Sequence, residues 1–204
     1  IVGEESKDLG FFRFKKFNFN SKELIIARSG YSKQGGFEIY VDDFNEGEAI
    51  WDTLFEAGQS LDVRAGCPNL IERIESGLLS FGSDMTNENT PHESGLSKFC
   101  DTRNAIKCVG RDALLKEIET GPWRQIRSLS ISGAAVPPCR SAWEVRANNI
   151  YVGRVSSAAW SPGHQTNVAL GMIHRDHWEP NTLVTVETPD GSREARIVSE
   201  PFTQ

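Results

Sequence analysis

Apolar runs predict a β-hairpin near the start of the chain. The continuous run in "ELIIARSG" (23–30) is typical of a buried strand, and "FEIYV" (37–41) alternates apolar and polar positions as its hairpin partner. Because strand side chains point alternately to opposite faces, Glu38 and Tyr40 share the face opposite to the apolar one. That polar face either meets water or lines a cavity. The alternating "FRFKK" (12–16) predicts a further, ordinary strand.

Helical periodicity appears in three later segments. Residues 45–58 form an amphipathic pattern, and Gly58 suits the position that follows a helix. A second helix is expected over 68–79, where apolar residues form one stripe, and a short one near 110–118. The intervening "FGSDMTNENTPHESGLSKF" (81–99) is polar and without period, so it predicts a long connection of the kind that often carries function.

From about residue 126 the pattern changes to six short alternating segments separated by turn residues, which predicts a small antiparallel β-barrel or sandwich. Within it we expect Ser161 and Pro162 to form a turn and Asn167 to cap a loop. The fold class is therefore α+β, with one domain over 1–120 and a barrel domain over 126–204. The expected strands are "IRSLSIS", "WEVRA", "IYVGRVSSA", "NVALGMI", "LVTVET" and "EARIVSE".

Composition narrows the functional classes. The 204 residues carry a formal charge of −6 without a basic block, which argues against a nucleic-acid partner. No apolar run approaches the ~20 residues that a membrane helix needs. The four cysteines have no CxxC spacing and the histidines no metal-binding spacing, so we expect no metal and reduced, mostly buried thiols in a cytoplasmic protein. Cys67 is expected to be a buried, inert thiol. Because the first residue is Ile, we expect the chain to be part of a longer polypeptide.

Five sequence blocks, in this order, resemble the folate-dependent aminomethyltransferase family, which includes the glycine-cleavage T-protein. The resemblance runs from about residue 23 to 200. It implies part of a pseudo-symmetric α/β body with a central folate channel, here residues 1–120, followed by the C-terminal β-barrel. It also implies that a further N-terminal portion of the protein precedes these blocks. The blocks are "RSGYSKQGGFEI", "ERIESGLLSFGSDM", "NTPHESGLSKF", "GRDAL" and "SPGHQTNVALGMI".

The resemblance implies a tetrahydrofolate site on the hairpin. The family's glutamate corresponds to Glu38, whose two carboxylate oxygens suit the amino and ring N–H donors of the pterin. Tyr31 would pack on the folate as an aromatic wall. Tyr40 projects beside Glu38, so we expect it to contact the methyl donor, since a sulfonium cation is attracted to an aromatic face. On the residues alone, a solvated glutamate and ordinary packing tyrosines are the alternatives.

Positions at which this sequence departs from the T-protein motifs indicate a different methyl donor. The family's folate-contacting arginine aligns with Asn69, while Arg64 lies five residues earlier and would need a bulge to replace it. A family tryptophan is replaced by Lys98, which could meet the folate glutamate, meet a substrate carboxylate or simply be solvated. The pieces "SKQGGFEIY", "VRAGCPNLIERIE" and "SGLSKFC" resemble the branch of the family that demethylates dimethylsulfoniopropionate.

The resemblance therefore implies a methyltransferase that moves a methyl group from this sulfonium compound to N5 of tetrahydrofolate, giving methylthiopropionate and 5-methyltetrahydrofolate. A glycine-cleavage aminomethyltransferase and a dimethylglycine-type demethylase remain alternatives. A non-catalytic folate-binding factor of iron–sulfur assembly is a third, although its K-G-C-Y-x-G-Q motif is replaced by "AGCPNLIE". Without its N-terminal portion the chain is expected to be inactive. The sequence does not determine the oligomeric state, and a homodimer is one possibility.

Overall fold

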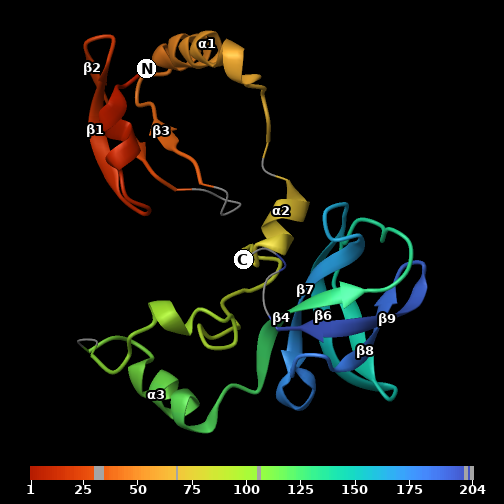
Figure 1. The fold of residues 1–204 in the computed structure, drawn as a ribbon. Coiled ribbons are helices and arrows are strands. Elements are labelled where there is room, and N and C mark those ends of the chain that lie inside the picture. The colour runs from red at the N-terminus through yellow and green to blue at the C-terminus, as the bar shows by residue number, and fades with distance from the viewer. Residues whose placement is uncertain (30–34, 68, 105–106, 200–201, 203–204) are drawn as a thin grey trace. The chain divides into compact units, whose positions relative to one another are not determined.

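The computed structural model describes residues 1–29, 35–67, 69–104, 107–199 and 202 (Figure 1). It has the predicted α+β class. The chain divides into two compact units, Ile1–Pro68 and Asn69–Gln204. The functional division at residues 1–120 and 126–204 stays a prediction.

A three-stranded antiparallel sheet organises the first unit, with the predicted hairpin at its centre and edge. The alternation of β1 and β2 sends Phe17, Leu24 and Ile26 into small hydrophobic clusters, against which Ile39 of β3 also packs. The sheet order is β1 (Phe14–Phe19), β2 (Lys22–Ala27) and β3 (Glu38–Tyr40), and the remaining elements are η1 (Glu4–Asp8), α1 (Glu46–Gly58) and η2 (Gln59–Leu61).

The end of α1 differs from the prediction for Gly58. This residue is the last of the helix, with a φ of −90°, and the chain continues directly into η2 rather than through a left-handed residue. A Cβ placed on Gly58 would lie 2.4 Å from Cγ2 of Val63. The glycine is therefore needed for close packing, and Asp62, with φ 53°, makes the left-handed turn instead.

The second helix is shorter than predicted. α2 spans Leu70–Glu75, because Gly77 adopts a left-handed φ of 66° and the N–H of Leu78 donates back to the carbonyl of Arg73 at 2.9 Å. The segment over 81–99 is an irregular connection, as predicted, and ends in η3 (Ser97–Phe99). α3 (Arg111–Thr120) follows close to its predicted place.

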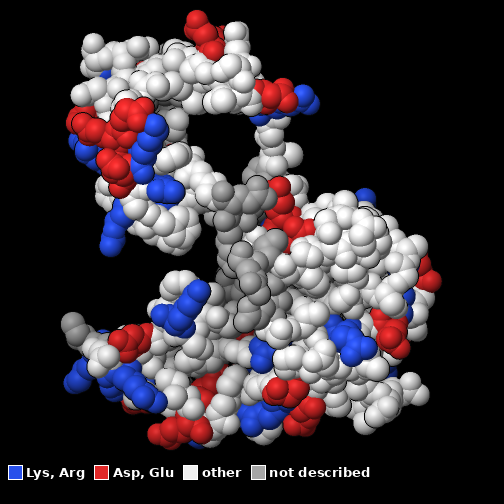
Figure 2. Space-filling view, viewed as in Figure 1, with Lys and Arg blue, Asp and Glu red and all other residues white. Residues whose placement is uncertain are grey.

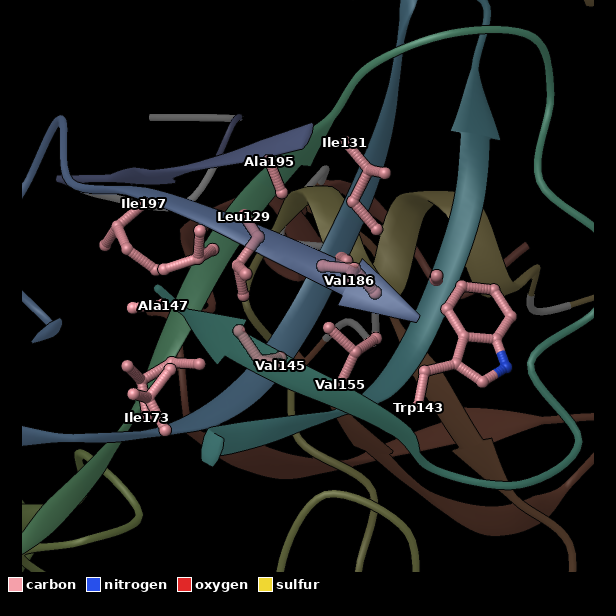
Figure 3. Close-up of a cluster of buried hydrophobic side chains, with 14 residues drawn as sticks. Leu129, Ile131, Trp143, Val145, Ala147, Val155, Ile173, Val186, Ala195 and Ile197 are labelled. Carbon is pink, nitrogen blue, oxygen red and sulfur yellow. The ribbon is translucent and has the colours of Figure 1, made fainter. Parts of the chain in front are cut away.

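The six predicted C-terminal strands form a closed antiparallel barrel with the order β4-β7-β6-β5-β8-β9 (Figure 1). Its interior is filled by side chains from all six strands, among them Leu129, Val155 and Val186, which have no exposed surface (Figure 3). The strands are β4 (Arg124–Ile131), β5 (Trp143–Ala147), β6 (Ile150–Ser161), β7 (Thr166–His174), β8 (Leu183–Thr188) and β9 (Gly191–Val198), with η4 (Arg175–His177) between β7 and β8.

The prediction of mostly buried cysteines is wrong. Cys67 and Cys108 are exposed, Cys100 and Cys139 are partly buried, and all four are free. Each of them lies outside the helices and strands, in connecting segments that run over the surface of a protein. The expectation that Cys67 is a buried thiol fails for this reason.

Several charges on the first unit lie in pairs of opposite sign. Figure 2 shows acidic and basic groups next to one another there, and the pairs include Lys15 with Glu5 at 2.5 Å and Lys16 with Glu23 at 3.0 Å. Exposed pairs of this kind contribute little to stability, because both charges stay in contact with water. Within the described ranges, every helix falls short of the length and apolar character that crossing a membrane demands.

Candidate functional site

Strand β3 places Glu38 and Tyr40 on one face of the first unit. In the antiparallel register, Glu38 lies opposite Ala27 and Tyr40 opposite Ile25. Ile39, between them, packs on the hydrophobic clusters, so the alternation directs its two neighbours to the other face. Glu38 is exposed, and 52% of the Tyr40 surface is accessible.

The described residues engage only one oxygen of the Glu38 carboxylate. Ser29 donates its hydroxyl to Oε2, and the phenol oxygen of Tyr40 lies 3.5 Å from the same atom. No described residue donates to Oε1. As far as the described residues go, the strand presents a carboxylate oxygen without a donor beside an exposed aromatic ring, an arrangement that suits a ligand with N–H donors.

Three other predictions concern the first unit. Tyr31 lies outside the described residues. Phe37 begins the "FEIYV" pattern, in which it alternates with Glu38 and so belongs to the apolar face. It precedes β3 and is 49% exposed, with the guanidinium of Arg28 5.9 Å from its ring centre. Arg64 forms a bidentate pair with Asp62, with distances of 3.1 and 2.9 Å from Nε and Nη2, and both side chains are exposed. Among the described residues, Arg64 has no contact with the Glu38 group.

Asn69 and Lys98 belong to the second unit. Asn69 is the N-cap of α2, where its Oδ1 accepts the N–H of Glu72 at 2.9 Å. Lys98 lies in η3 with its ammonium 4.9 Å from the centre of the Phe99 ring, and it lines an open cavity of about 570 Å³. Asn69 thus has a structural role that its alignment with a family arginine does not suggest.

The sequence reasoning assigned no role to a buried polar network in the second unit. Arg73 of α2 donates to Asp84 at 2.6 Å and to the hydroxyl of Ser157 at 2.6 Å. A β-bulge after Val155 turns Ser156 and Ser157 to the same side, and both hydroxyls lie 2.7 Å from Oδ1 of Asp84. The network fastens α2 and the following connection to barrel strand β6. Arg73 and Asp84 both lie in the block "ERIESGLLSFGSDM", so the sequence contains the two charged residues of the network. The serines that bind them lie in a distant strand, and the block does not identify them.

Asn167 has the predicted role of capping a loop. Its side chain is fully buried and donates from Nδ2 to the carbonyls of Ile131 at 3.1 Å and Ala134 at 3.0 Å. Its Oδ1 accepts the N–H of Val136 at 2.8 Å. Ser161 ends β6 at a turn over 162–165, as predicted, and accepts the N–H of His164 at 3.1 Å.

No group of three or more His, Cys, Asp or Glu side chains gathers among the described residues in a way that could hold a metal ion. The thiol of Cys139 is not activated, because burial, with a contribution from Asp84, raises its pKa to about 11.

Comparison with known proteins identifies the family. Residues 3–104 match the family model of the GCVT N-terminal domain, and residues 124–204 match that of the glycine cleavage T-protein C-terminal barrel domain. The dimethylsulfoniopropionate demethylase DmdA of Ruegeria pomeroyi is 52% identical over 197 residues, which cover 97% of this chain and 53% of that protein. An aminomethyltransferase of Prochlorococcus marinus is 27% identical over 99% of this chain and 54% of its own length.

A solved structure has the same fold. The crystal structure of glycine cleavage system aminomethyltransferase T from Bartonella henselae matches with a TM-score of 0.79 and 25% identity, over 97% of this chain and 54% of that chain. The chain spans about half the length of the curated relatives it matches. The two matching family models and the closed barrel agree with the order of sequence blocks, and the chain belongs to the glycine cleavage T-protein family.

Proposed function

We propose that this chain is part of a tetrahydrofolate-dependent methyltransferase that demethylates dimethylsulfoniopropionate. The observation that carries the proposal is the pair formed by Glu38 and Tyr40 on the exposed face of β3. The 52% identity to a dimethylsulfoniopropionate demethylase, against 27% to 31% for the aminomethyltransferases, supports the sulfonium donor over an aminomethyl donor.

Each residue has a role that follows from its chemistry. Oε1 of Glu38 accepts N–H donors of the pterin, while Ser29 holds the other oxygen in place. The ring of Tyr40 offers its face to the sulfonium cation, an attraction of about 0.5–2 kcal/mol. Tyr31 packs on the folate. Arg64 and Lys98 are secondary candidates for its negatively charged glutamate tail.

The reaction places few demands on acid–base groups. Tetrahydrofolate supplies the N5 lone pair that accepts the methyl group. A bond forms between N5 and the methyl carbon while the methyl carbon–sulfur bond breaks with its electron pair staying on sulfur. The sulfur of methylthiopropionate is then an uncharged thioether, and the N5 proton leaves to solvent. The protein contributes alignment of donor and acceptor rather than a nucleophile. Loss of charge at sulfur also makes a dry site favourable.

The relatives are about twice as long as this chain, which supports a site completed by a further N-terminal portion. Residues 1–120 are then the C-terminal part of the folate-binding body, and the isolated chain is inactive. The four free thiols support a reducing, cytoplasmic location. Homodimer formation remains a prediction.

The test uses the protein extended to the length of its relatives. Glu38→Ala should weaken tetrahydrofolate binding by about 1.5–3 kcal/mol, as expected for losing hydrogen bonds to a charged group, measured by calorimetry. Glu23→Ala removes an exposed glutamate from the neighbouring strand β2 and should leave folate affinity unchanged. Equal affinity of the Glu38 variant and the parent would refute the folate role.

The methyl donor is tested by product analysis. With dimethylsulfoniopropionate and tetrahydrofolate, we expect methylthiopropionate and 5-methyltetrahydrofolate in equal amounts. Dimethylglycine or an aminomethyl donor should give no turnover. Release of ammonia from an aminomethyl donor would instead favour the glycine-cleavage activity of the family.

A further inference from the structure

Apart from Lys98, the residues that line a polar cavity in the second unit have no role in the proposed methyl transfer. The cavity is an open hollow of about 570 Å³ between the connection that contains η3, the C-terminal half of α3 and the start of β4. Its volume lies within the range of about 300–1,000 Å³ that is usual for small-molecule sites. The residues that bear on its chemistry are His92, Lys98, Asp101, Thr102, Arg103 and Glu117.

Buried polar atoms without partners concentrate in the wall of this cavity. Across the described residues, five buried side-chain nitrogen or oxygen atoms lack a hydrogen-bond partner, and three of them are His92 Nε2, Thr102 Oγ1 and Glu117 Oε2. His92 is only 7% exposed and Thr102 only 3%. Leaving such a group unpaired costs about 1–3 kcal/mol, so three around one hollow indicate a polar occupant.

Other polar atoms of these three residues are held by hydrogen bonds. Nδ1 of His92 lies 2.8 Å from the hydroxyl of Ser97, which fixes the imidazole ring. Oε1 of Glu117 accepts the hydroxyl of Thr90 at 2.8 Å, which leaves Oε2 as a carboxylate acceptor. Arg111 donates to the backbone carbonyl of Thr102 at 3.0 Å. The unpaired atoms therefore sit on side chains that are already oriented.

Charges of both signs line the cavity. Glu117 and Asp101 are acidic, and Asn104 donates from its side chain and backbone to Asp101, which lowers the pKa of that carboxyl. Lys98 and Arg103 are basic. Within the described ranges neither forms a direct ion pair, although the charge of Arg103 acts on Asp101 and contributes to lowering its pKa. A simple anion or a simple cation would leave half of these charges unmatched.

We propose that this cavity binds a small zwitterion, with its cationic group toward Glu117 and its carboxylate toward Lys98. A ligand of this kind satisfies the unpaired Oε2 of Glu117, and its carboxylate matches the one position in the block "NTPHESGLSKF" where a lysine replaces the tryptophan of the family. The inference concerns binding alone and does not depend on the methyl transfer proposed above.

The experiment follows the imidazole signals of the full chain by NMR. His92 is assigned through His92→Gln, and His164, which packs near Phe202 outside the cavity, is the internal reference. The probes are dimethylsulfoniopropionate, glycine betaine and methylthiopropionate. The last has the carboxylate and chain of the first but no cationic group. We expect saturable shifts of His92 with both zwitterions, and about tenfold weaker binding of methylthiopropionate, equivalent to about 1.4 kcal/mol.

Two matched pairs of variants locate the charges. Glu117→Gln should weaken zwitterion binding about tenfold without affecting methylthiopropionate, whereas Glu119→Gln, an exposed change on the same helix, should affect neither. Lys98→Met should weaken all three probes, and Lys116→Met, exposed on α3, none.

The outcomes separate the sources of the ligand. Preference for dimethylsulfoniopropionate over betaine supports a site for the methyl donor, and equal binding supports a site for zwitterions in general. Absence of any His92 shift, or equal binding of methylthiopropionate and the zwitterions, would overturn the proposal. Because no folate or turnover is involved, these results are independent of the methyl-transfer assay.

Discussion

Arg73 and Asp84 form a buried ion pair in which Nη1 and Oδ2 lie 2.6 Å apart, with side-chain exposures of 4% and 0%. Both charges are also hydrogen-bonded to neutral groups: Arg73 donates to the carbonyl of Leu78 at 2.7 Å, and Asp84 accepts the N–H of Ser80 at 2.8 Å. Charges removed from water are tolerated only when their hydrogen-bonding capacity is filled in this way. The pair therefore joins α2, its following connection and the barrel into one unit.

Arg73→Met should destabilise the second unit by about 3–5 kcal/mol, because it leaves the Asp84 carboxylate buried without its counter-charge. Urea unfolding followed by tryptophan fluorescence measures this, since Trp143 is buried in the barrel core. Arg146→Met is the control, because Arg146 pairs with Glu144 on the surface and its loss should cost less than about 1 kcal/mol. Similar midpoints for the two variants would contradict the structural role of the buried pair.

Gly153→Ala should destabilise the barrel by about 3 kcal/mol or more. A Cβ at this position on β6 would lie 2.2 Å from the carbonyl oxygen of Met172 on the neighbouring strand β7, and backbone atoms in a sheet cannot move away cheaply. In Gly163→Ala the nearest atom to the new Cβ is 4.0 Å away, so stability should hardly change. Thermal unfolding of the two variants compares them. Equal melting temperatures would mean that β6 and β7 are less closely paired than described.

Cys139 should be the slowest of the four thiols to react with a neutral alkylating reagent at pH 8. Its pKa of about 11 leaves about one thiol in a thousand as thiolate at that pH, whereas Cys67 and Cys108 are exposed. Because the thiolate is the reactive form, the alkylation rate of Cys139 should rise about tenfold per pH unit between pH 8 and 10. Peptide mass spectrometry after timed alkylation gives the rate of each cysteine. Labelling of Cys139 as fast as Cys67 at pH 8 would contradict the raised pKa.

The predictable parts of the fold are those encoded by local periodicity. The period-two pattern around Ile39 places Glu38 and Tyr40 on one face, and the same alternation marks the barrel strands β5 and β8. Contacts between segments that lie far apart in the sequence produce no periodic pattern, so they could not be predicted in this way. Arg73 meets Ser157 across 84 residues of sequence, through a bulge that no propensity reveals.

The residues of the candidate sites likewise fall into those that a local pattern predicts and those that depend on contacts between distant segments. Glu38 and Tyr40 follow from strand geometry and family resemblance together. The positions of the unpaired atoms of His92, Thr102 and Glu117 depend on how an irregular connection folds against α3. Such a segment has no hydrophobic periodicity from which its conformation could be predicted. The predicted length of the second helix was wrong because Gly77 adopts a left-handed φ of 66° and α2 ends at Glu75. At Gly58 the helix end was predicted, but the packing of this glycine against Val63 was not.

Tyr40 provides the sharpest test of the methyl-donor position in the protein extended to the length of its relatives. Tyr40→Phe keeps the aromatic face and loses only the phenol oxygen 3.5 Å from Glu38, so demethylation kinetics should stay close to those of the parent. Tyr40→Ala removes the ring and should raise KM for the sulfonium donor about 2- to 30-fold, which corresponds to 0.5–2 kcal/mol of cation–π attraction. Tyr151→Ala removes an exposed tyrosine from the barrel strand β6 and serves as the control. If Tyr40→Ala demethylates the donor as well as Tyr151→Ala does, Tyr40 does not contact the sulfonium group, and the donor binds elsewhere on the protein.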